Sequence, residues 1–150
     1  MKHDIRLITA LLMATGSLFA SAVIPPTADA DPGSTLSVTV EHVAEPRGQI
    51  MVAIFKGEEA YKTNQPIQAT AASVEGDTVT TEFHLEPGEY GIKLYHDVNG
   101  DGEMNTNPFG MPTEPFGFSN NAPVRFGPPG WNAAKFEIGA EGASQIISIN

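Results

Sequence analysis

The stretch that decides the fold is T-V-T-T-E-F-H-L-E-P-G-E-Y-G-I-K-L-Y-H, residues 78–96. Val, Thr, Phe and Leu stand at every second position of residues 79–85, and Tyr, Ile, Leu and His do so in residues 90–96. Such alternation turns one face of a segment to a core and the other to water, which is typical of a half-buried β-strand. Pro87 and Gly88 suit the two central positions of a turn. The stretch therefore predicts two strands joined by a tight turn.

Further strands are expected on both sides of this stretch. Residues 35–41 alternate, residues 49–56 are apolar on both faces like a central strand, and residues 67–74 form a weaker strand. Residues 134–138 and 145–149 complete the set, while residues 58–64 suggest one helical turn. About seven short strands separated by turns predict an all-β fold, an antiparallel immunoglobulin-like or transthyretin-like sandwich.

The first 30 residues do not fit this pattern. A basic head precedes an apolar run at residues 7–23, and Ala28-Asp29-Ala30 places small residues where a signal peptidase cuts. The run falls short of the roughly 20 residues that a spanning helix needs, which disfavours the alternative of an uncleaved anchor. We expect residues 1–30 to be a signal peptide and residues 31–150 to be a single β-sandwich domain, periplasmic or secreted.

Charge and composition limit the kinds of partner and chemistry that the chain can have. The chain has 18 acidic and 8 basic residues, a net charge of −10, and no cysteine. A strongly acidic surface repels nucleic acid and anionic lipid headgroups, so we expect no nucleic-acid partner and no membrane association after signal cleavage. The absence of cysteine excludes a thiol nucleophile, a cysteine-linked lipid anchor and cysteine-ligated zinc.

Residues 97–131 show no strand pattern, and we predict one long ordered loop there. Glycine and proline recur throughout, yet five large aromatic residues are too many for a solvated tail. Loops this long are usually functional when they are ordered. The aromatic residues could form a stacking surface for a sugar or peptide, or a mini-core that pins the loop, and we favour the mini-core. They are Phe109, Phe116, Phe118, Phe126 and Trp131.

The start of this loop, H-D-V-N-G-D-G-E-M-N at residues 96–105, resembles part of a calcium-binding loop. Oxygen-bearing side chains stand at positions 1, 3 and 5 counted from Asp97, and Gly102 stands at position 6, where such loops turn sharply. Glu103 would contribute its backbone carbonyl. The candidate calcium ligands are Asp97, Asn99, Asp101, Glu103 and Asn105.

The calcium pattern is incomplete, and an alternative stays open. Position 12 is Pro108 instead of a bidentate glutamate, so a sixth ligand would have to come from elsewhere, with Glu114 nearest. The alternative is that Asn-Gly and Asp-Gly form plain turns whose side chains bond their own backbone. Any calcium binding would be weak because the charged ligands are few.

Other residues of the loop are expected to anchor it. His96 shares its strand face with Ile92 and Leu94 and should be a buried, hydrogen-bonded histidine. G-F-S-N-N at residues 117–121 lacks the last glycine of a nucleophile elbow, so its polar side chains should satisfy loop backbone groups. The alternative is a hydrolase with His96, Glu114 or Ser119 at this loop. The expected loop-anchoring residues are His96, Glu114, Phe116, Phe118, Ser119 and Asn120.

Residues 85–121, from L-E-P-G-E-Y-G through H-D-V-N-G-D-G-E-M-N to G-M-P-T-E-P-F-G-F-S-N-N, resemble a bacterial family called domain of unknown function 2141 (DUF2141). That family shows L-P-P-G-x-Y-A, then H-D-x-N-x-N-G-x-x-D, then G-x-P-x-E-x-[YF]-G-[FV]-S-N. Asp101 stands where the family often has Asn, Asn105 where it often has Asp, and Glu86 replaces a proline.

The resemblance implies an exported β-sandwich protein but no reaction. We therefore expect a non-catalytic binding or structural module of unknown ligand, with no cofactor other than calcium. Calcium stabilisation of the H-D-V-N-G-D-G loop and plain turns there remain the two alternatives. A protein that acts only with an envelope partner is a further alternative.

Overall fold

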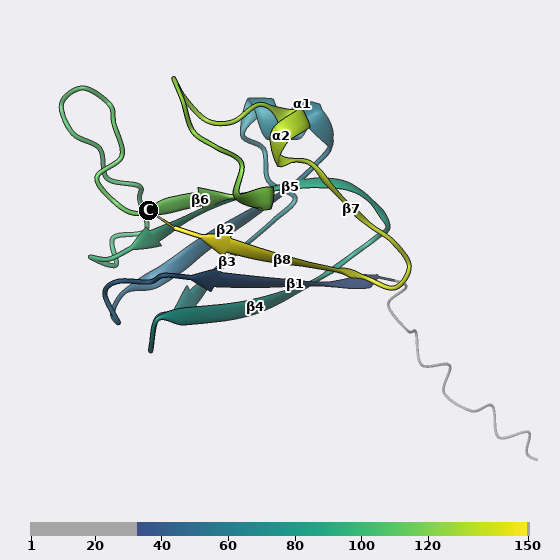
Figure 1. Ribbon diagram of the computed structural model, residues 1–150, viewed down its shortest axis with the longest axis horizontal. Helices are drawn as coiled ribbons and strands as arrows, with labels where there is room; N and C mark the ends of the chain where they lie inside the picture. The colour runs from purple at the N-terminus through teal and green to yellow at the C-terminus, as the bar shows by residue number, and fades with distance from the viewer. Residues whose placement is uncertain (1–32, 150) are drawn as a thin grey trace, which may run out of the picture. The chain divides into compact units, whose positions relative to one another are not determined.

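The computed structural model describes residues 33–149, and the expected signal peptide lies outside these described residues. Within residues 33–149, eight strands carry the fold, with two short α-helices and one 3-10 turn among them (Figure 1). In chain order the elements are β1 (Ser34–Glu41), β2 (Gln49–Lys56), α1 (Gly57–Thr63), β3 (Gln68–Ser73), β4 (Thr78–Leu85), β5 (Gly88–Asp97), β6 (Phe116–Phe118), η1 (Ser119–Asn121), α2 (Trp131–Ala134), β7 (Phe136–Ile138) and β8 (Ala143–Ser148).

The strands form two sheets, which confirms the predicted all-β sandwich. One sheet has the order β4-β1-β8, and the other has the order β3-β2-β5-β6 with β7 also paired to β5. The pairings are antiparallel except for β1 and β8, which run parallel. The turn at Pro87 and Gly88 does not make a hairpin, because β4 pairs with β1 and β5 pairs with β2. It carries the chain from one sheet to the other.

The alternating apolar side chains form the core between the sheets. Burying them is the main favourable term in folding, at about 25 cal/mol per Å² of apolar surface. Most of the core residues come from the inward positions of strands. The fully buried members include Leu36, Val38, Ile50, Ile54, Tyr90, Ile92, Ile138 and Ile147.

A second, smaller cluster lies on the outer face of the five-stranded sheet. The ring of Tyr61 in α1 packs against Phe55 and against Trp131 of α2, each at 5.6 Å between ring centroids. Gly91 of β5 makes room for it, since a Cβ there would lie 2.8 Å from the Tyr61 ring and 3.1 Å from Trp131. The two helices are therefore packed onto the sheet by aromatic side chains.

The prediction that residues 97–131 hold no strand is wrong at Phe116–Phe118, which form β6 and pair with β5. Three residues are too few to show a period in the sequence. The tertiary reason is the central Gly117, whose missing side chain lets β6 approach β8: a Cβ there would lie 2.7 Å from Ile147 Cγ2. The helix α2 was also not predicted.

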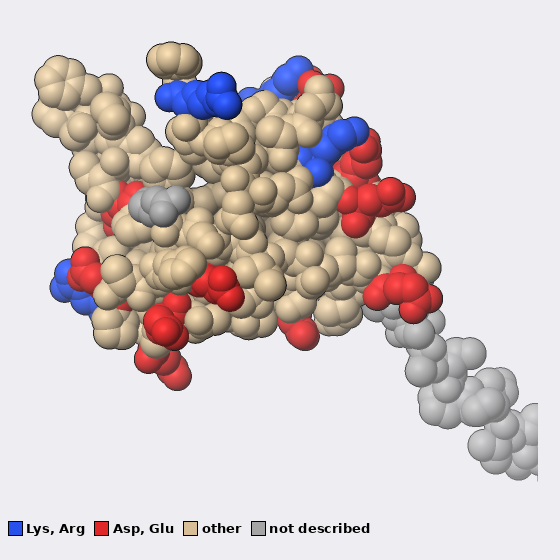
Figure 2. Space-filling view, viewed as in Figure 1, with Lys and Arg blue, Asp and Glu red and all other residues tan. Residues whose placement is uncertain are grey.

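Two connections project from the sandwich, residues 98–115 between β5 and β6 and residues 122–130 between η1 and α2 (Figure 1). In Figure 2 the outer ends of both protrusions carry no acidic side chains on the face in view, while acidic side chains gather toward the strands and α1. Among residues 33–149, no helix has the length and apolar character needed to cross a bilayer.

Candidate functional site

Asp97 ends β5 and organises the turn that follows. Its side chain is buried, Oδ1 accepts the backbone N–H groups of Gly100 (2.7 Å) and Asp101 (3.2 Å), and Oδ2 accepts that of Gly102 (2.8 Å) and Gln49 Nε2 (3.0 Å). These bonds, led by that from Gln49, hold the pKa of Asp97 below its usual value. A carboxylate offers about four acceptor sites, so these four donors use them all.

Glu114 anchors the far end of the same connection. It is buried, and its two carboxylate oxygens accept the backbone N–H groups of Val98 and Asn105, each at 3.0 Å. The backbone N–H of Thr113 donates to the carbonyl of Asn105 (2.9 Å). One carboxylate thus clamps both arms of the connection, because it satisfies donors that lie seven residues apart.

Three more of the predicted metal ligands converge on one another. Asn99 Nδ2 lies 2.9 Å from Asp101 Oδ2 and 2.7 Å from Asn105 Oδ1, and Asn105 Nδ2 lies 3.0 Å from the same Asp101 oxygen. The pKa of Asp101 is lowered, mainly by the hydrogen bond from the backbone N–H of Glu103. The side chain of Glu103 itself is exposed.

The arrangement fits calcium only in part. No group of three or more His, Asp or Glu side chains within residues 33–149 is placed to hold a metal ion. Asp97 has no free acceptor site, and Glu114 is used as a clamp. Asn99 Oδ1 accepts the backbone N–H of Asp101 (3.0 Å), and the Nδ2 groups of Asn99 and Asn105 face the Asp101 carboxylate. A cation at these side chains would therefore have to displace hydrogen bonds. Asn99, Asp101 and Asn105 are still the best-placed oxygen donors.

His96 lies inside the core at the end of β5, as expected from its strand face. It is fully buried, and its Nε2 lies 2.7 Å from the carbonyl oxygen of Arg47, to which it donates. Its Nδ1 has no partner within the described residues. Its backbone N–H donates to the carbonyl of Pro115 (2.8 Å), so His96 also ties β5 to the end of the connection.

Residues 119–121 join three parts of the fold. Ser119 is fully buried, where its hydroxyl accepts the backbone N–H of Ile92 (2.9 Å) and donates to the carbonyl of Ala134. Asn120 Nδ2 donates to the carbonyls of Ala133 and Lys135. These contacts attach β6 to β5 and to α2. Both side chains bond backbone groups, which leaves Ser119 without a basic partner for nucleophilic chemistry.

The three residues named for a hydrolase do not meet. His96 contacts Arg47, Glu114 contacts Val98 and Asn105, and Ser119 contacts Ile92 and Ala134. Ile92 and His96 alone are about 13 Å apart along an extended strand. A nucleophile and its base must lie within hydrogen-bond reach, so this geometry does not support the hydrolase.

The loop aromatics divide into two groups. Phe118 and Trp131 are buried and Phe116 packs against the same cluster, as the mini-core prediction requires. For Phe109 and Phe126 that prediction is wrong, because their side chains are 89% and 108% exposed. Both stand on projecting connections out of reach of the sheet.

A groove lies on the outer face of the five-stranded sheet, with a volume of about 370 Å³. Met51 and Ala53 of β2 and Lys93 of β5 form part of its floor, and both projecting connections contribute to its walls. The side chains that line it are mostly apolar. The wall and floor residues include Phe55, Pro66, Ala69, Tyr95, Met104, Phe116, Phe118 and Pro128.

Lys93 is the one basic residue among those lining this groove. Its Nζ donates to the carbonyl of Tyr61 (2.8 Å) and to Asn64 Oδ1 (3.1 Å), and lies 4.7 Å and 4.4 Å from the ring centroids of Phe55 and Tyr61. Burial lowers its pKa. An ammonium group has three donors, and these two hydrogen bonds use two of them.

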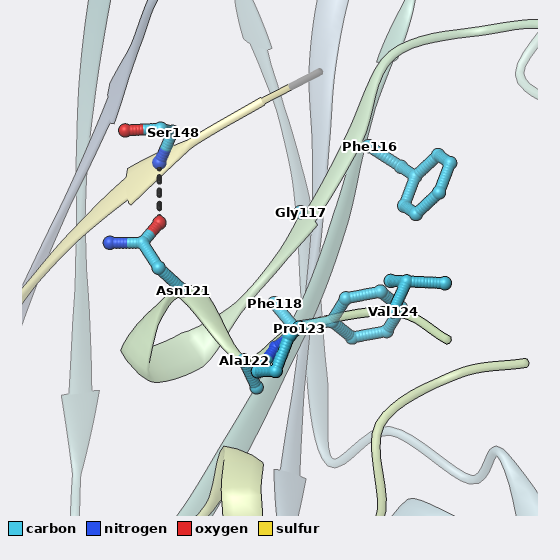
Figure 3. Close-up of a pocket in the computed structure, with 8 residues that line it drawn as sticks. All are labelled: Phe116, Gly117, Phe118, Asn121, Ala122, Pro123, Val124 and Ser148. Atoms are coloured by element: carbon cyan, nitrogen blue, oxygen red, sulfur yellow. Dashed lines mark hydrogen bonds between the residues drawn. The ribbon is translucent and has the colours of Figure 1, made fainter.

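A second cavity of about 380 Å³ lies beside β6 and opens between Asn121, Val124 and Ser148 (Figure 3). Figure 3 shows the Asn121 side chain directed at the backbone of Ser148 in β8. The lining of this cavity also includes Phe116, Phe118, Ala122 and Pro123. It offers no charged side chain to a ligand.

The groove residues Met51, Ala53 and Lys93 were not found from the sequence. Asn121 was among the polar side chains expected to satisfy backbone groups, and it bonds those of β8. A signal existed for Met51 and Ala53, because residues 49–56 are apolar on both faces. A strand that is apolar on both faces is covered by other residues on its outer face as well as on its core face. Nothing in the sequence places Lys93 against Tyr61, because the two are brought together by the packing of α1.

Comparison with known proteins agrees with the resemblance drawn from residues 85–121. The family model described as "Uncharacterized protein conserved in bacteria (DUF2141)" matches residues 38–146. No curated protein matches the chain, and no solved structure matches it.

Proposed function

The chain belongs to the DUF2141 family, whose description names no activity, and from the geometry above we propose that it is an exported, non-catalytic binding module. Its ligand occupies the groove on the outer face of the five-stranded sheet. The observation that carries the proposal is a mostly apolar cavity of about 370 Å³ with a single basic residue, Lys93. Small-molecule sites are mostly apolar, with a few polar groups that fix orientation.

The chemistry of the groove favours one class of ligand. Met51, Ala53 and Phe116 offer apolar surface, and the remaining donor of Lys93 favours an acceptor or an anion. The lowered pKa of Lys93 reflects its desolvation, and an anionic group beside it would offset that effect by favouring the charged form. We therefore propose an amphipathic ligand with an apolar body and one acidic or carbonyl group.

A dye of this class tests the groove directly. Anilinonaphthalene sulfonate combines an aromatic body with an anion, and its fluorescence rises on apolar binding. Ala53→Leu would fill the floor of the groove, and Lys93→Met would remove its charge. Each should weaken dye binding by about tenfold, which corresponds to a loss of about 1.4 kcal/mol of binding free energy. Ser37→Leu, at an outward position of β1 in the other sheet, is the matched control. Equal dye affinity in the wild type and both groove variants, with folding retained, would refute the proposed site.

Calcium is proposed as a weak stabiliser of the connection that forms one wall of the groove. Asn99, Asp101 and Asn105 already converge, and Glu103 can add its backbone carbonyl. Asp97 would join them only by giving up an N–H donor. Because the set holds few charges, the dissociation constant should lie near the millimolar range, about 10⁻⁴–10⁻³ M.

Thermal melting with added calcium tests this site. The midpoint should rise with calcium in the wild type and stay constant in Asp101→Asn, which keeps the shape but loses the charge. Magnesium at equal concentration controls for ionic strength, because it prefers a smaller, octahedral site. An unchanged wild-type midpoint at millimolar calcium would remove the metal from the proposal.

Export is proposed from the order of the first 30 residues alone. Mass spectrometry of the protein from a bacterial periplasmic fraction should find a chain that begins near Asp31. Recovery of the full-length chain from the cytoplasm alone would contradict this part of the proposal.

A further inference from the structure

The two projecting connections end in exposed apolar side chains. We call residues 107–111 and 123–127 the two tips. Phe109 is 89% exposed and Met111 62% in the first, while Phe126 is 108% exposed and Val124 44% in the second. Large apolar groups exposed together usually mark an interaction site. The packing of the sandwich does not account for them, since they contribute to neither apolar cluster.

The first tip is a built structure with its own hydrogen bonds. Asn107 Oδ1 accepts the backbone N–H groups of Phe109 (2.9 Å) and Met111 (3.1 Å), and the backbone N–H of Asn107 donates to the carbonyl of Met111 (2.8 Å). The clamp at Glu114 holds the base of the same connection. Phe109 and Met111 are therefore presented outward by an ordered turn.

The charges of the chain avoid this region. Of 18 acidic and 8 basic residues, the segment 104–134 contains one of each, Glu114 and Arg125. Glu114 is buried and both its oxygens accept backbone N–H groups. A chain of net charge −10 thus presents, at both tips, a surface without exposed acidic groups and with one cation.

The shape of the region favours a lipid surface over a protein. Figures 1 and 2 show both connections projecting from the sandwich on the same side, as separate protrusions and not as one flat face. A stable protein interface needs about 800 Å² of closely packed surface from each partner. Separate apolar tips need only a soft apolar medium, and interfacial helices and anchors enter lipid with the same Phe, Leu and Arg chemistry.

We propose that the two tips insert together into the interface of a lipid bilayer with neutral, zwitterionic headgroups. Phe109, Met111 and Phe126 enter the acyl boundary, while the aliphatic stem of Arg125 lies along it and its guanidinium remains at headgroup phosphates. The expectation of no membrane association rested on the net charge. The negative net charge opposes binding to anionic lipid. Because no exposed acidic residue lies in either tip, it does not prevent the tips from entering neutral lipid. This inference goes beyond the proposed function, because it requires neither calcium nor a ligand in the groove.

Cosedimentation with phosphatidylcholine vesicles tests the proposal with the mature chain. The wild type should bind, and the double variant Phe109→Ser/Phe126→Ser should bind at least about tenfold more weakly, because each buried phenylalanine is worth about a factor of ten or more. Ile146→Ser is the matched control, since Ile146 is 57% exposed on β8 and belongs to neither tip. Its binding should equal that of the wild type.

Phe126→Trp reports on insertion separately. Its emission should shift to shorter wavelength on vesicle addition and be quenched by lipids brominated on the acyl chain, whereas the buried Trp131 should not respond. Equal vesicle binding by the double variant and the wild type overturns the proposal. So does binding that appears only with anionic lipid and disappears with salt. A wild-type dimer in solution that the double variant loses, without vesicle binding, would assign the tips to a second copy of the chain and overturn it too.

Discussion

The side chain of Asn121 lies along the edge of β8, where its Oδ1 accepts the backbone N–H of Ser148 at 2.8 Å (Figure 3). Its Nδ2 donates to the carbonyl of Ile146 at 3.0 Å. One amide thereby satisfies the groups that a neighbouring strand would otherwise pair with. β8 ends the order β4-β1-β8, and unpaired edges invite association between chains. Asn121 therefore closes the sandwich at β6 and protects this edge.

Replacing Asn121 should destabilise the fold and open the edge. Asn121→Ala loses two hydrogen bonds and places alanine at a φ of 50°, so it should cost about 2–3 kcal/mol in denaturant unfolding. Asn121→Gly tolerates that φ and should cost about 1–2 kcal/mol through the hydrogen bonds alone. A cost below that of Asn132→Ala, at an exposed position of α2, would contradict this role for Asn121.

Asp97 should make the stability of the domain depend on acidic pH. Its folded pKa lies below its unfolded value of about 3.9, so its contribution is present above that pH and is lost as the pH falls through the folded pKa. Asp97→Asn should lower the melting temperature at neutral pH, and the gap to the wild type should narrow toward pH 2. Glu75→Gln, an exposed acid before β4, is the control. A gap that stayed constant with pH would contradict the prediction.

The Glu114 clamp should control the order of residues 98–115. Glu114→Gln keeps one acceptor oxygen but turns its NH₂ group toward a backbone N–H. The variant should therefore lower the free energy of unfolding by about 1–3 kcal/mol. Hydrogen exchange at the amides of Val98 and Asn105 should accelerate before exchange elsewhere does. Glu103→Gln alters an exposed acid of the same connection and should leave both amides protected. Unchanged exchange in Glu114→Gln would show that the clamp is not needed.

Gly91 should not tolerate a side chain. Gly91→Ala drives a Cβ to 2.8 Å from the Tyr61 ring, and overpacking of this kind costs about 1–3 kcal/mol. Gly76→Ala meets nothing within 4 Å and should be neutral or slightly stabilising. Urea unfolding of both variants makes the comparison. Equal free energies of unfolding for the two variants would contradict the prediction, because they would mean that α1 can move off the sheet without loss of stability.

Tyr61 should resist ionisation, and its burial should make the domain lose stability at strongly alkaline pH. Burial raises its pKa to about 12, above the unfolded value of about 10. Its contribution is therefore complete below pH 10 and is lost as the pH rises from 10 to 12. Ultraviolet absorbance titration should show the delayed phenol, and Tyr61→Phe should remove it. Tyr61→Phe also loses the hydrogen bond to the Pro129 carbonyl, which ties α1 to the second projecting connection.

The sequence by itself determined the strands with full alternation. Residues 35–41, 78–85 and 90–96 are predictable because period two places every apolar side chain on one face, and burial of that face needs no knowledge of the partner. The inward orientation of His96 and the turn after Asp97 were also predictable, because both depend on neighbouring residues in the sequence. The family pattern in residues 85–121 agreed with this fold class and added no reaction.

Only the tertiary structure decided which surfaces face each other. The parallel pairing of β1 with β8, the short β6 and the contact of Lys93 with Tyr61 join residues distant in sequence, whose attraction depends on their final positions. The same holds for the aromatic residues of the long connection. Phe118 and Phe126 look alike in sequence, yet one is buried and the other fully exposed, because only β6 reaches the sheet. An apolar residue in the sequence indicates that burying its side chain would be favourable. The packing of the whole chain decides whether the protein itself buries it.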